Sequence, residues 1–406
     1  MITRYASGWL QNSPLGGRNQ KIDLDYWLLG ACLCLLGLGL VMNASASSAV
    51  SAAHNNGNHY YYFIRHSLYV TVSLAAALCC LLVPVKRWEK WSWPLLVVAF
   101  LLLVLVYVPG IGHEVNGSKR WLNLRVFNLQ SSEPAKLFMV FFIAGYLVRH
   151  QVELEKKLFG FVKPLAVLLI FAGLIYAEPD FGATTVMVGS VVVMIFLAGT
   201  SMKVAAPLLV ILGGLGWFFV TAESYRLERI TSFTDPFRDQ FGSGYQLSQA
   251  LIAFGRGDVF GAGLGNSIQK QFYLPEAHTD FVFAVLAEEL GMIGALLTVA
   301  MLTFVCIRAL RIGRRAQLAG QAFAAYCAYG IAMMWTGQAF INIGVNAGLL
   351  PTKGLTLPFI SYGGSSLMIC CISLAVLIRI EWELRQSLKA AARPLRQPVQ
   401  KEMDYA

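Results

Sequence analysis

Charged residues are scarce in this chain. Asp, Glu, Lys and Arg make up 13% of its 406 residues, whereas a soluble domain carries about 25%. The hydrophobic fraction is 57%, the mean hydropathy is +0.59, and apolar runs such as Trp93 to Val108 alternate with short polar clusters. A soluble core does not need such runs. The scarcity of charge therefore excludes an ordinary water-soluble domain and indicates helices that cross a bilayer.

The chain also lacks the features of a nucleic-acid-binding or disulfide-stabilised protein. The formal net charge is +10, but the Lys and Arg residues interrupt apolar segments instead of forming a stripe. We interpret them as signals of membrane topology and expect no nucleic acid. All eight cysteines fall in apolar runs, and none lies in a polar loop with metal-ligand spacing. They are interpreted as small packing residues rather than as disulfides or zinc ligands.

Ten apolar runs are candidates for transmembrane helices, because a bilayer core about 30 Å thick needs about 20 apolar residues per helix. They lie near 26–46, 66–84, 92–109, 134–149, 164–177, 182–200, 204–222, 281–307, 319–344 and 366–381. The sequence therefore predicts an all-α, polytopic membrane protein. Its ten helices form one membrane domain, 26–384, between an N-terminal tail at 1–25 and a C-terminal tail at 385–406.

The distribution of Lys and Arg predicts the orientation. An even number of spans puts both termini on one side, and most of the 32 basic residues lie in the tails and short loops of that side. The positive-inside rule therefore predicts cytoplasmic termini in a bacterial inner membrane. The longest outer segment, 223–280, is then a large periplasmic loop between helices 7 and 8. Its apolar stretch Leu247 to Phe254 predicts that the loop folds against the bundle.

A first polar cluster precedes and enters the fourth span. Glu133 and Lys136 are three residues apart, so they share one face of a helix, and Pro134 suits its first turn. The two residues form either an ion pair that pins the helix or part of a functional site. Lys119 and Arg120 are adjacent cations on the side that the positive-inside rule disfavours, and they either extend to lipid headgroups or bind an anionic phosphate.

A second polar cluster ends the large outer loop. Asp280 lies at the predicted start of the eighth span, where it either caps the helix or takes a proton from an alcohol as a general base. Capping does not account for Glu276, His278 and Thr279, which we assign to substrate binding. Glu288 and Glu289 follow deeper in the span, where each carboxylate needs a cationic partner, and we expect an arginine or lysine of another span.

A third segment, 346–366, is rich in proline and glycine, which forbids a continuous helix. Irregular backbone at membrane depth persists only where protein or a wet cavity surrounds it, so a re-entrant loop beside a site is predicted. This loop contributes Lys353 and Ser361 as candidate substrate ligands. A shorter break of the same kind runs from Glu178 to Gly182. Gly261 to Gly265 resembles a dinucleotide loop, but no strand precedes it, so a turn is predicted.

Cations, carboxylates and a broken helix thus converge on the outer leaflet. Their natural ligand is a lipid that carries phosphate, with its tail in the bilayer and its headgroup against the cations. A base beside a phosphate-binding patch indicates transfer of a group away from a phosphate leaving group. A transporter of the same lipid would share most of these features, so both functions remain open at this point.

These clusters resemble the SEDS family (shape, elongation, division and sporulation) along essentially the whole chain. The stretch Asn342 to Ser366 carries the most specific resemblance, and Pro351 to Pro358 is more similar to the division branch than to the elongation branch, RodA. The resemblance implies a peptidoglycan glycosyltransferase that polymerises lipid II. It also implies an essential aspartate at Asp280, a glutamate–lysine pair at Glu133 and Lys136, and an arginine–tryptophan motif at Arg120 and Trp121. The chain departs from the family pattern at Ser131, where a proline is usual.

The reaction implied by the resemblance needs a base and a stabilised leaving group. We hypothesise that Asp280 deprotonates the acceptor's C4 hydroxyl, which attacks the donor's anomeric carbon and expels undecaprenyl diphosphate with inversion. A divalent cation (Mg or Mn) is a candidate cofactor whose ligands are unassigned, and no organic cofactor is expected. The alternatives are a lipid II flippase, a RodA-like elongation polymerase and a non-catalytic scaffold. The implied partners are a class B penicillin-binding protein (FtsI-like) and the regulators FtsQ, FtsL and FtsB at the division septum.

Overall fold

The computed structural model describes residues 24–115, 118–123, 128–151, 159–199, 210, 213–214, 233, 235–239 and 241–391. In this part of the chain it contains ten helices and one three-stranded antiparallel sheet. The helices are α2 (Tyr26–His54), α3 (Tyr61–Leu81), α4 (Val85–Leu105), α5 (Ser132–Arg149), α7 (Phe159–Ala177), α8 (Phe181–Leu197), α11 (Tyr245–Gly257), α12 (Val282–Leu318), α13 (Ala322–Asn346) and α14 (Gly364–Ala391). The strands are β1 (Gly112–Val115), β2 (Ser118–Asn123) and β3 (Asn128–Gln130).

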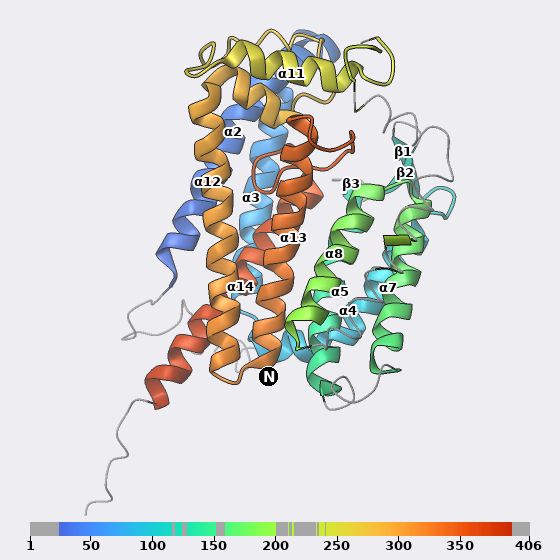
Figure 1. Ribbon diagram of the computed structural model, residues 1–406, viewed down its shortest axis with the longest axis vertical. Coiled ribbons are helices and arrows are strands. Elements are labelled where there is room, and N and C mark those ends of the chain that lie inside the picture. The colour runs from blue at the N-terminus through green and yellow to red at the C-terminus, as the bar shows by residue number, and fades with distance from the viewer. Residues whose placement is uncertain are drawn as a thin grey trace, which may run out of the picture.

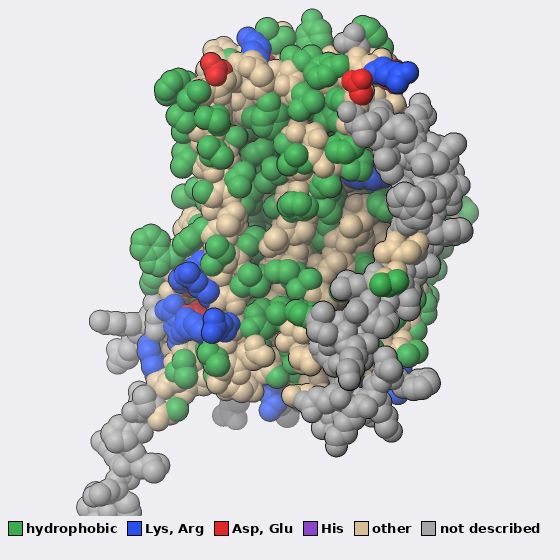
Figure 2. All heavy atoms as spheres, in the orientation of Figure 1, with side chains coloured by type: hydrophobic (Ala, Val, Ile, Leu, Met, Phe, Trp, Pro, Cys, Tyr) green, Lys and Arg blue, Asp and Glu red, His purple; other side chains and the backbone are tan. Residues whose placement is uncertain are grey.

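The long helices run side by side as one bundle (Figure 1). Helix α11 lies across one end, which also carries the strands, and this is called the α11 end. Helix α2 begins and α14 ends at the opposite end, called the basic end. On the face in Figure 2, hydrophobic side chains cover the middle of the bundle, and Lys and Arg gather most densely towards the basic end. This distribution is typical of a protein that spans a membrane.

Nine of the ten predicted spans coincide with described helices, whereas the seventh, 204–222, lies almost entirely outside the described residues. Five described helices have the length and apolar composition to cross a bilayer: α2, α3, α4, α7 and α12. Helix α8 is a shorter apolar helix. The prediction of a mostly helical, polytopic membrane protein is confirmed. Several helices extend beyond the predicted spans, and α14 continues to Ala391, because backbone hydrogen bonding persists where the apolar run has ended.

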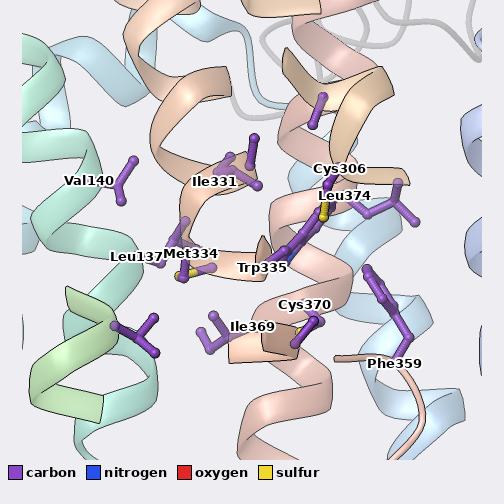
Figure 3. Packing of buried hydrophobic residues seen from close by; sticks show 14 of the residues in the cluster. Leu137, Val140, Cys306, Ile331, Met334, Trp335, Phe359, Ile369, Cys370 and Leu374 are labelled. Atoms are coloured by element: carbon purple, nitrogen blue, oxygen red, sulfur yellow. The ribbon is translucent and has the colours of Figure 1, made fainter. Parts of the chain in front are cut away.

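Helices α5, α13 and α14 are less uniformly apolar because they form the centre of the bundle. Nearly every residue of α5 is buried. Helices that contact protein instead of lipid can carry polar side chains, provided that these find partners. Buried apolar side chains form a large cluster among these helices. Figure 3 shows residues from four helices and the 347–363 segment packed together: Leu137, Val140, Cys306, Ile331, Met334, Trp335, Phe359, Ile369, Cys370 and Leu374.

Helix α12 is interrupted at Gly291, whose φ of +69° is readily adopted by glycine. The segment after α11 supplies the hydrogen bonds that the break removes. Backbone N–H groups of Met292 and Ile293 donate to the carbonyls of Asp258 and Val259, at 2.8 and 3.3 Å. In return, the carbonyls of Glu288 and Glu289 accept N–H groups from the glycine-rich segment, at 2.9 and 3.1 Å. The predicted turn at 261–265 is therefore a close-packed connection to α12.

Partners for Glu288 and Glu289 come from the outer loop, not from another span as expected. Arg256 lies 2.6 Å from Glu288, and Lys270 lies 2.7 Å from Glu289. The Ser45 hydroxyl on α2 also donates to Glu289, at 2.6 Å. These bonds attach the loop to α12 and α2. Leu247 and Ala250 are buried and the Phe254 ring packs on Phe283 of α12, which confirms that the apolar part of the loop folds against the bundle.

Ion pairs join three helices at the basic end. Arg308 on α12 lies 2.5 Å from Asp25, which caps α2. Glu381 on α14 accepts from Arg315 on α12 at 2.6 Å and from Arg385 at 2.7 Å. Ion pairs therefore hold α2, α12 and α14 together at the basic end.

The sheet at the α11 end was not predicted. Strand β2 pairs with β1 and β3, and the β1–β2 register shifts between His113 and Glu114. The strands are 3 to 6 residues long, too short to show a periodicity against the surrounding apolar runs. Arg120 lies on β2 of this sheet, at the α11 end.

Candidate active site

Asp280 lies immediately before α12, and α13 fixes its backbone. The side-chain amides of Asn342 and Asn346 donate to the Asp280 carbonyl at 2.8 and 3.0 Å. Asn346 also accepts the N–H of Ala284, at 3.0 Å, in the first turn of α12. The N-cap residue is Phe281, and no side chain caps at that position. The interpretation of Asp280 as a helix cap is therefore wrong, because Asn346 satisfies the free N–H group instead.

The Asp280 carboxyl is half-buried beside the 347–363 segment. A Cβ added to Gly354 would lie 2.8 Å from Asp280 Oδ2, so glycine leaves room for this carboxyl. Burial raises the pKa of Asp280 to about 7, and the charges of Glu276 and Asp180 act in the same direction while Arg120 opposes them. A carboxyl with a pKa near neutrality is suited to general base catalysis.

The other residues of this cluster shape the loop around Asp280. The Thr279 hydroxyl donates to Glu276 Oε2 at 2.7 Å, and Glu276 is exposed. The His278 carbonyl accepts the N–H of Tyr362 at 3.0 Å, which ties the loop to the 347–363 segment. The His278 ring lies 5.3 Å from the ring of Tyr62. Burial lowers the pKa of His278, and the charge of Glu276 opposes this effect.

The structure separates Lys119 from Arg120. They are neighbours on β2, where successive side chains point to opposite faces, and Lys119 is exposed while Arg120 is half-buried. Arg120 Nη2 donates to the Ser118 hydroxyl at 3.0 Å, and its buried Nε has no partner. Its charge acts on both Asp280 and Glu178. Of the two predicted phosphate ligands, Arg120 is thus the one whose charge acts on Asp280.

Glu133 and Lys136 form a buried ion pair, with 2.9 Å between Lys136 Nζ and Glu133 Oε1. Lys136 also donates to Gln338 Oε1 on α13 at 3.2 Å. Gln338 Nε2 in turn donates to the Thr356 carbonyl at 3.0 Å and to the Ser366 hydroxyl at 3.2 Å. This geometry matches the ion-pair interpretation, since the pair links α5 to α13 and to the 347–363 segment. Its contact with substrate stays a prediction.

The 347–363 segment lacks helix and packs inside the bundle, as its prolines and glycines predicted. Asn43 on α2 donates to the Ile360 carbonyl at 3.0 Å. Lys353 lies over the ring of Phe181, 4.7 Å from its centroid, at the start of α8. Ser361 is buried, and its hydroxyl accepts the N–H of Leu357 at 2.7 Å, so it serves the turn itself.

Two acidic residues of the site were not assigned from the sequence. Asp180 caps α8 through Ala183 N–H at 3.1 Å, and its Oδ2 accepts from Gln130 and Ser132, both at 2.9 Å. Glu178 accepts the Ser131 hydroxyl at 2.8 Å, and burial raises its pKa to about 8. The helix break at 178–182 was the one sequence feature that pointed to these two residues. That the break lies near Arg120 and Asp280 depends on how the helices pack.

A metal centre built from the protein alone does not fit this site. In the described residues, no group of three or more His, Cys, Asp or Glu side chains is placed to hold a metal ion. Asp180 already accepts three hydrogen bonds, and its neighbour Glu178 is buried against Ser131. The expected divalent cation therefore has no preformed set of protein ligands here.

Comparison with known proteins gives matches over most of the chain. The model of the FtsW, RodA and SpoVE family, described as cell cycle protein, matches residues 26–386. A probable peptidoglycan glycosyltransferase FtsW of Pseudomonas fluorescens is 57% identical over 90% of this chain and 90% of its own length. A protein of the same description from Coxiella burnetii is 51% identical over 88% of this chain and 96% of its own.

Solved structures share the fold. A chain from work described as "Structural coordination of polymerization and crosslinking by a peptidoglycan synthase complex" aligns with a TM-score of 0.70 and 26% identity, covering 90% of this chain and 100% of that chain. The rod shape determining protein RodA of Thermus thermophilus aligns with a TM-score of 0.64 and 24% identity, covering 88% of this chain and 97% of its own.

Proposed function

Because this chain belongs to the FtsW, RodA and SpoVE family of cell cycle proteins, we propose that it is a peptidoglycan glycosyltransferase that polymerises lipid II during cell division. The observation that carries the proposal is the Asp280 carboxyl. It is half-buried at the α11 end with a pKa of about 7, and the cation of Arg120 acts on it. The charge of Arg120, the proposed cation for the leaving diphosphate, thus acts on Asp280, the proposed base.

The proposed reaction uses Asp280 as its base. Its carboxylate takes the proton of the C4 hydroxyl on the acceptor's terminal N-acetylglucosamine. The oxygen attacks the anomeric carbon of the donor's N-acetylmuramic acid, a new C–O bond forms, and the bond to the diphosphate breaks with its electron pair. The α linkage of lipid II becomes β, which is inversion. A single base suffices because the diphosphate leaves as an anion.

The leaving diphosphate needs cations positioned before the reaction begins. Arg120 is the first candidate, since its guanidinium is half-buried and its Nε has no partner. Lys353 is the second, because it lies at the start of α8 beside Phe181. Lys136 is already committed to Glu133 and Gln338, so its contribution is to hold α5, α13 and the 347–363 segment in position.

Two observations favour a polymerase over a lipid II flippase. A polar headgroup crossing the bundle would need polar side chains along its path, whereas buried apolar residues of α5, α12, α13 and α14 pack against one another, as Figure 3 shows. Ion pairs also hold α2, α12 and α14 together at the basic end. The division branch is favoured over elongation, because the FtsW relatives are 57% and 51% identical while the RodA structure is 24% identical.

We place the protein in the inner membrane at the division septum, with both termini in the cytoplasm and the α11 end in the periplasm. Its proposed partners are a class B penicillin-binding protein, FtsI-like, and the regulators FtsQ, FtsL and FtsB. The description of the similar structure, a peptidoglycan synthase complex that coordinates polymerisation and crosslinking, supports the transpeptidase partner. The divalent cation, Mg or Mn, remains a proposal that the assay below tests.

The deciding experiment measures glycan formation from lipid II by the purified protein. Assays run with and without the transpeptidase partner and with each metal in turn. A general base contributes about 10²- to 10⁴-fold, so Asp280→Asn should lose nearly all turnover. Asp258→Asn is the matched control: Asp258 is exposed at the same end, and asparagine also adopts its positive φ. Normal polymerisation by Asp280→Asn would exclude Asp280 as the base.

A further inference from the structure

Glu178 is a fully buried carboxyl with an incomplete set of partners. It lies between α7 and α8, and its relative exposure is 0%. Its Oε2 accepts the Ser131 hydroxyl at 2.8 Å, whereas its Oε1 is buried without a partner. In the described residues it forms no ion pair. A buried carboxylate in such surroundings is costly, because neither water nor a counter-charge stabilises the anion.

The Arg120 side chain also has a buried polar atom without a hydrogen-bond partner. Its Nε is buried and has no partner, although its Nη2 donates to Ser118. Ser131 connects the two residues, since its hydroxyl donates to Glu178 and its N–H donates to the Arg120 carbonyl at 3.3 Å. Ser131 thus bonds the Glu178 carboxyl and the Arg120 backbone, while the carboxyl and the guanidinium each keep one buried atom without a partner and form no ion pair.

The uncharged form of Glu178 explains why no ion pair forms. Burial raises its pKa to about 8, and the nearby Asp180 adds to this effect. The Ser131 hydrogen bond and the Arg120 charge act in the opposite direction but do not outweigh burial. At pH 7 the group is therefore mostly a neutral acid, and a neutral acid attracts a guanidinium far less than a carboxylate does.

We propose that Glu178 is a positioning residue that stays protonated during catalysis and thereby leaves the guanidinium of Arg120 free for the substrate's diphosphate. This inference rests on the proposed function. Ionised Glu178 would draw Arg120 into a buried ion pair and remove the cation from the leaving group. Polymerisation should then decline at alkaline pH, as the Glu178 carboxyl loses its proton.

The other groups that face Glu178 do not explain a decline near pH 8. The Tyr107 hydroxyl donates to the Leu174 carbonyl, and burial raises its pKa to about 12. Arg120 remains charged throughout this range. Asp180 is held by three hydrogen-bond donors, so its position does not depend on Glu178.

The test is the pH profile of lipid II polymerisation for the parent protein and for Glu178→Gln. The glutamine keeps the shape of the neutral acid and cannot ionise. The parent rate should fall about tenfold by pH 9, as expected for loss of one proton with a pKa about one unit lower. Glu178→Gln should keep the acid limb that belongs to Asp280 and lose the alkaline decline. Glu114→Gln, an exposed residue on β1, is the matched control and should keep the parent profile.

A second variant, Ser131→Ala, tests the same inference if Glu178→Gln does not fold. Ser131 precedes α5 without a side-chain capping bond, so Ser131→Ala removes the donor to Glu178 but no helix cap. Because that hydrogen bond lowers the pKa of Glu178, its loss should move the alkaline decline to higher pH.

Three results would overturn the inference. They are an alkaline decline that Glu178→Gln retains, a parent rate that does not fall by pH 9, and a Ser131→Ala profile that is unchanged or shifted to lower pH. In each of these cases the parent still polymerises lipid II, so the proposed function survives. If the parent forms no glycan at any pH with its partner present, the proposed function fails and the role of Glu178 fails with it.

Discussion

Replacing Lys136 by methionine separates the structural role of the buried ion pair from a role in substrate binding. Lys136 Nζ contacts Glu133 at 2.9 Å and Gln338 at 3.2 Å, and both charged side chains are almost inaccessible to solvent. Methionine fills much of the same volume without the charge. Lys136→Met therefore leaves Glu133 as a buried carboxylate without a counter-ion and removes the link from α5 to α13.

The expected loss of stability is large. Breaking a buried ion pair by removing one partner costs about 3–5 kcal/mol, because the remaining charge stays desolvated. Removing both charges is much less harmful, since well-packed neutral side chains often replace a buried pair without net cost. The double variant Glu133→Gln, Lys136→Met should therefore recover most of the loss and lie within about 1 kcal/mol of the parent.

Unfolding in mixed micelles, followed by tryptophan fluorescence, measures these differences. Lys90→Met is the control for the substitution itself, because Lys90 is exposed on α4. Equal stability of Lys136→Met and the parent would refute the reasoning, and so would a double variant no more stable than the single one. The polymerisation rate of the folded double variant then tests substrate contact. A structural pair predicts retained turnover, and a ligand pair predicts its loss.

Two further predictions concern Asp280 and Gly291. The pKa of Asp280 is raised to about 7 and a base must be unprotonated, so the polymerisation rate should rise with pH through neutrality; a rate independent of pH between 5 and about 8 would contradict this assignment. Gly291→Ala should destabilise the protein by about 1–3 kcal/mol, because φ is +69° and a Cβ would collide with the Gly261 nitrogen. Unfolding measurements, with exposed Gly255→Ala as the control, check this prediction.

Candidate site residues are easier to recognise in the sequence than their relations to one another. Asp280 was found because it ends an outer loop where a span begins, and Arg120 because a cation there runs against the positive-inside rule. Sequence spacing also placed Glu133 and Lys136 on one face of a helix. Spacing did not reveal that the Asn346 side chain accepts the Ala284 N–H in the first turn of α12. It also did not reveal that Glu178 lies close enough to Arg120 for their charges to interact. These relations join residues 58 to 62 positions apart, the differences between 120 and 178 and between 284 and 346.

Hydropathy alone was enough to predict a helical, polytopic membrane protein, because the length and apolar character of each span are local properties of the chain. The sequence also determined where helices must break, since proline and glycine act on their own backbone. Only the tertiary structure decided which polar groups meet. Glu288 and Glu289 pair with the outer loop rather than with another span, Lys136 reaches Gln338 on α13, and Arg120 turns inward while Lys119 does not. Such pairings follow from how helices pack, and packing depends on the whole chain at once.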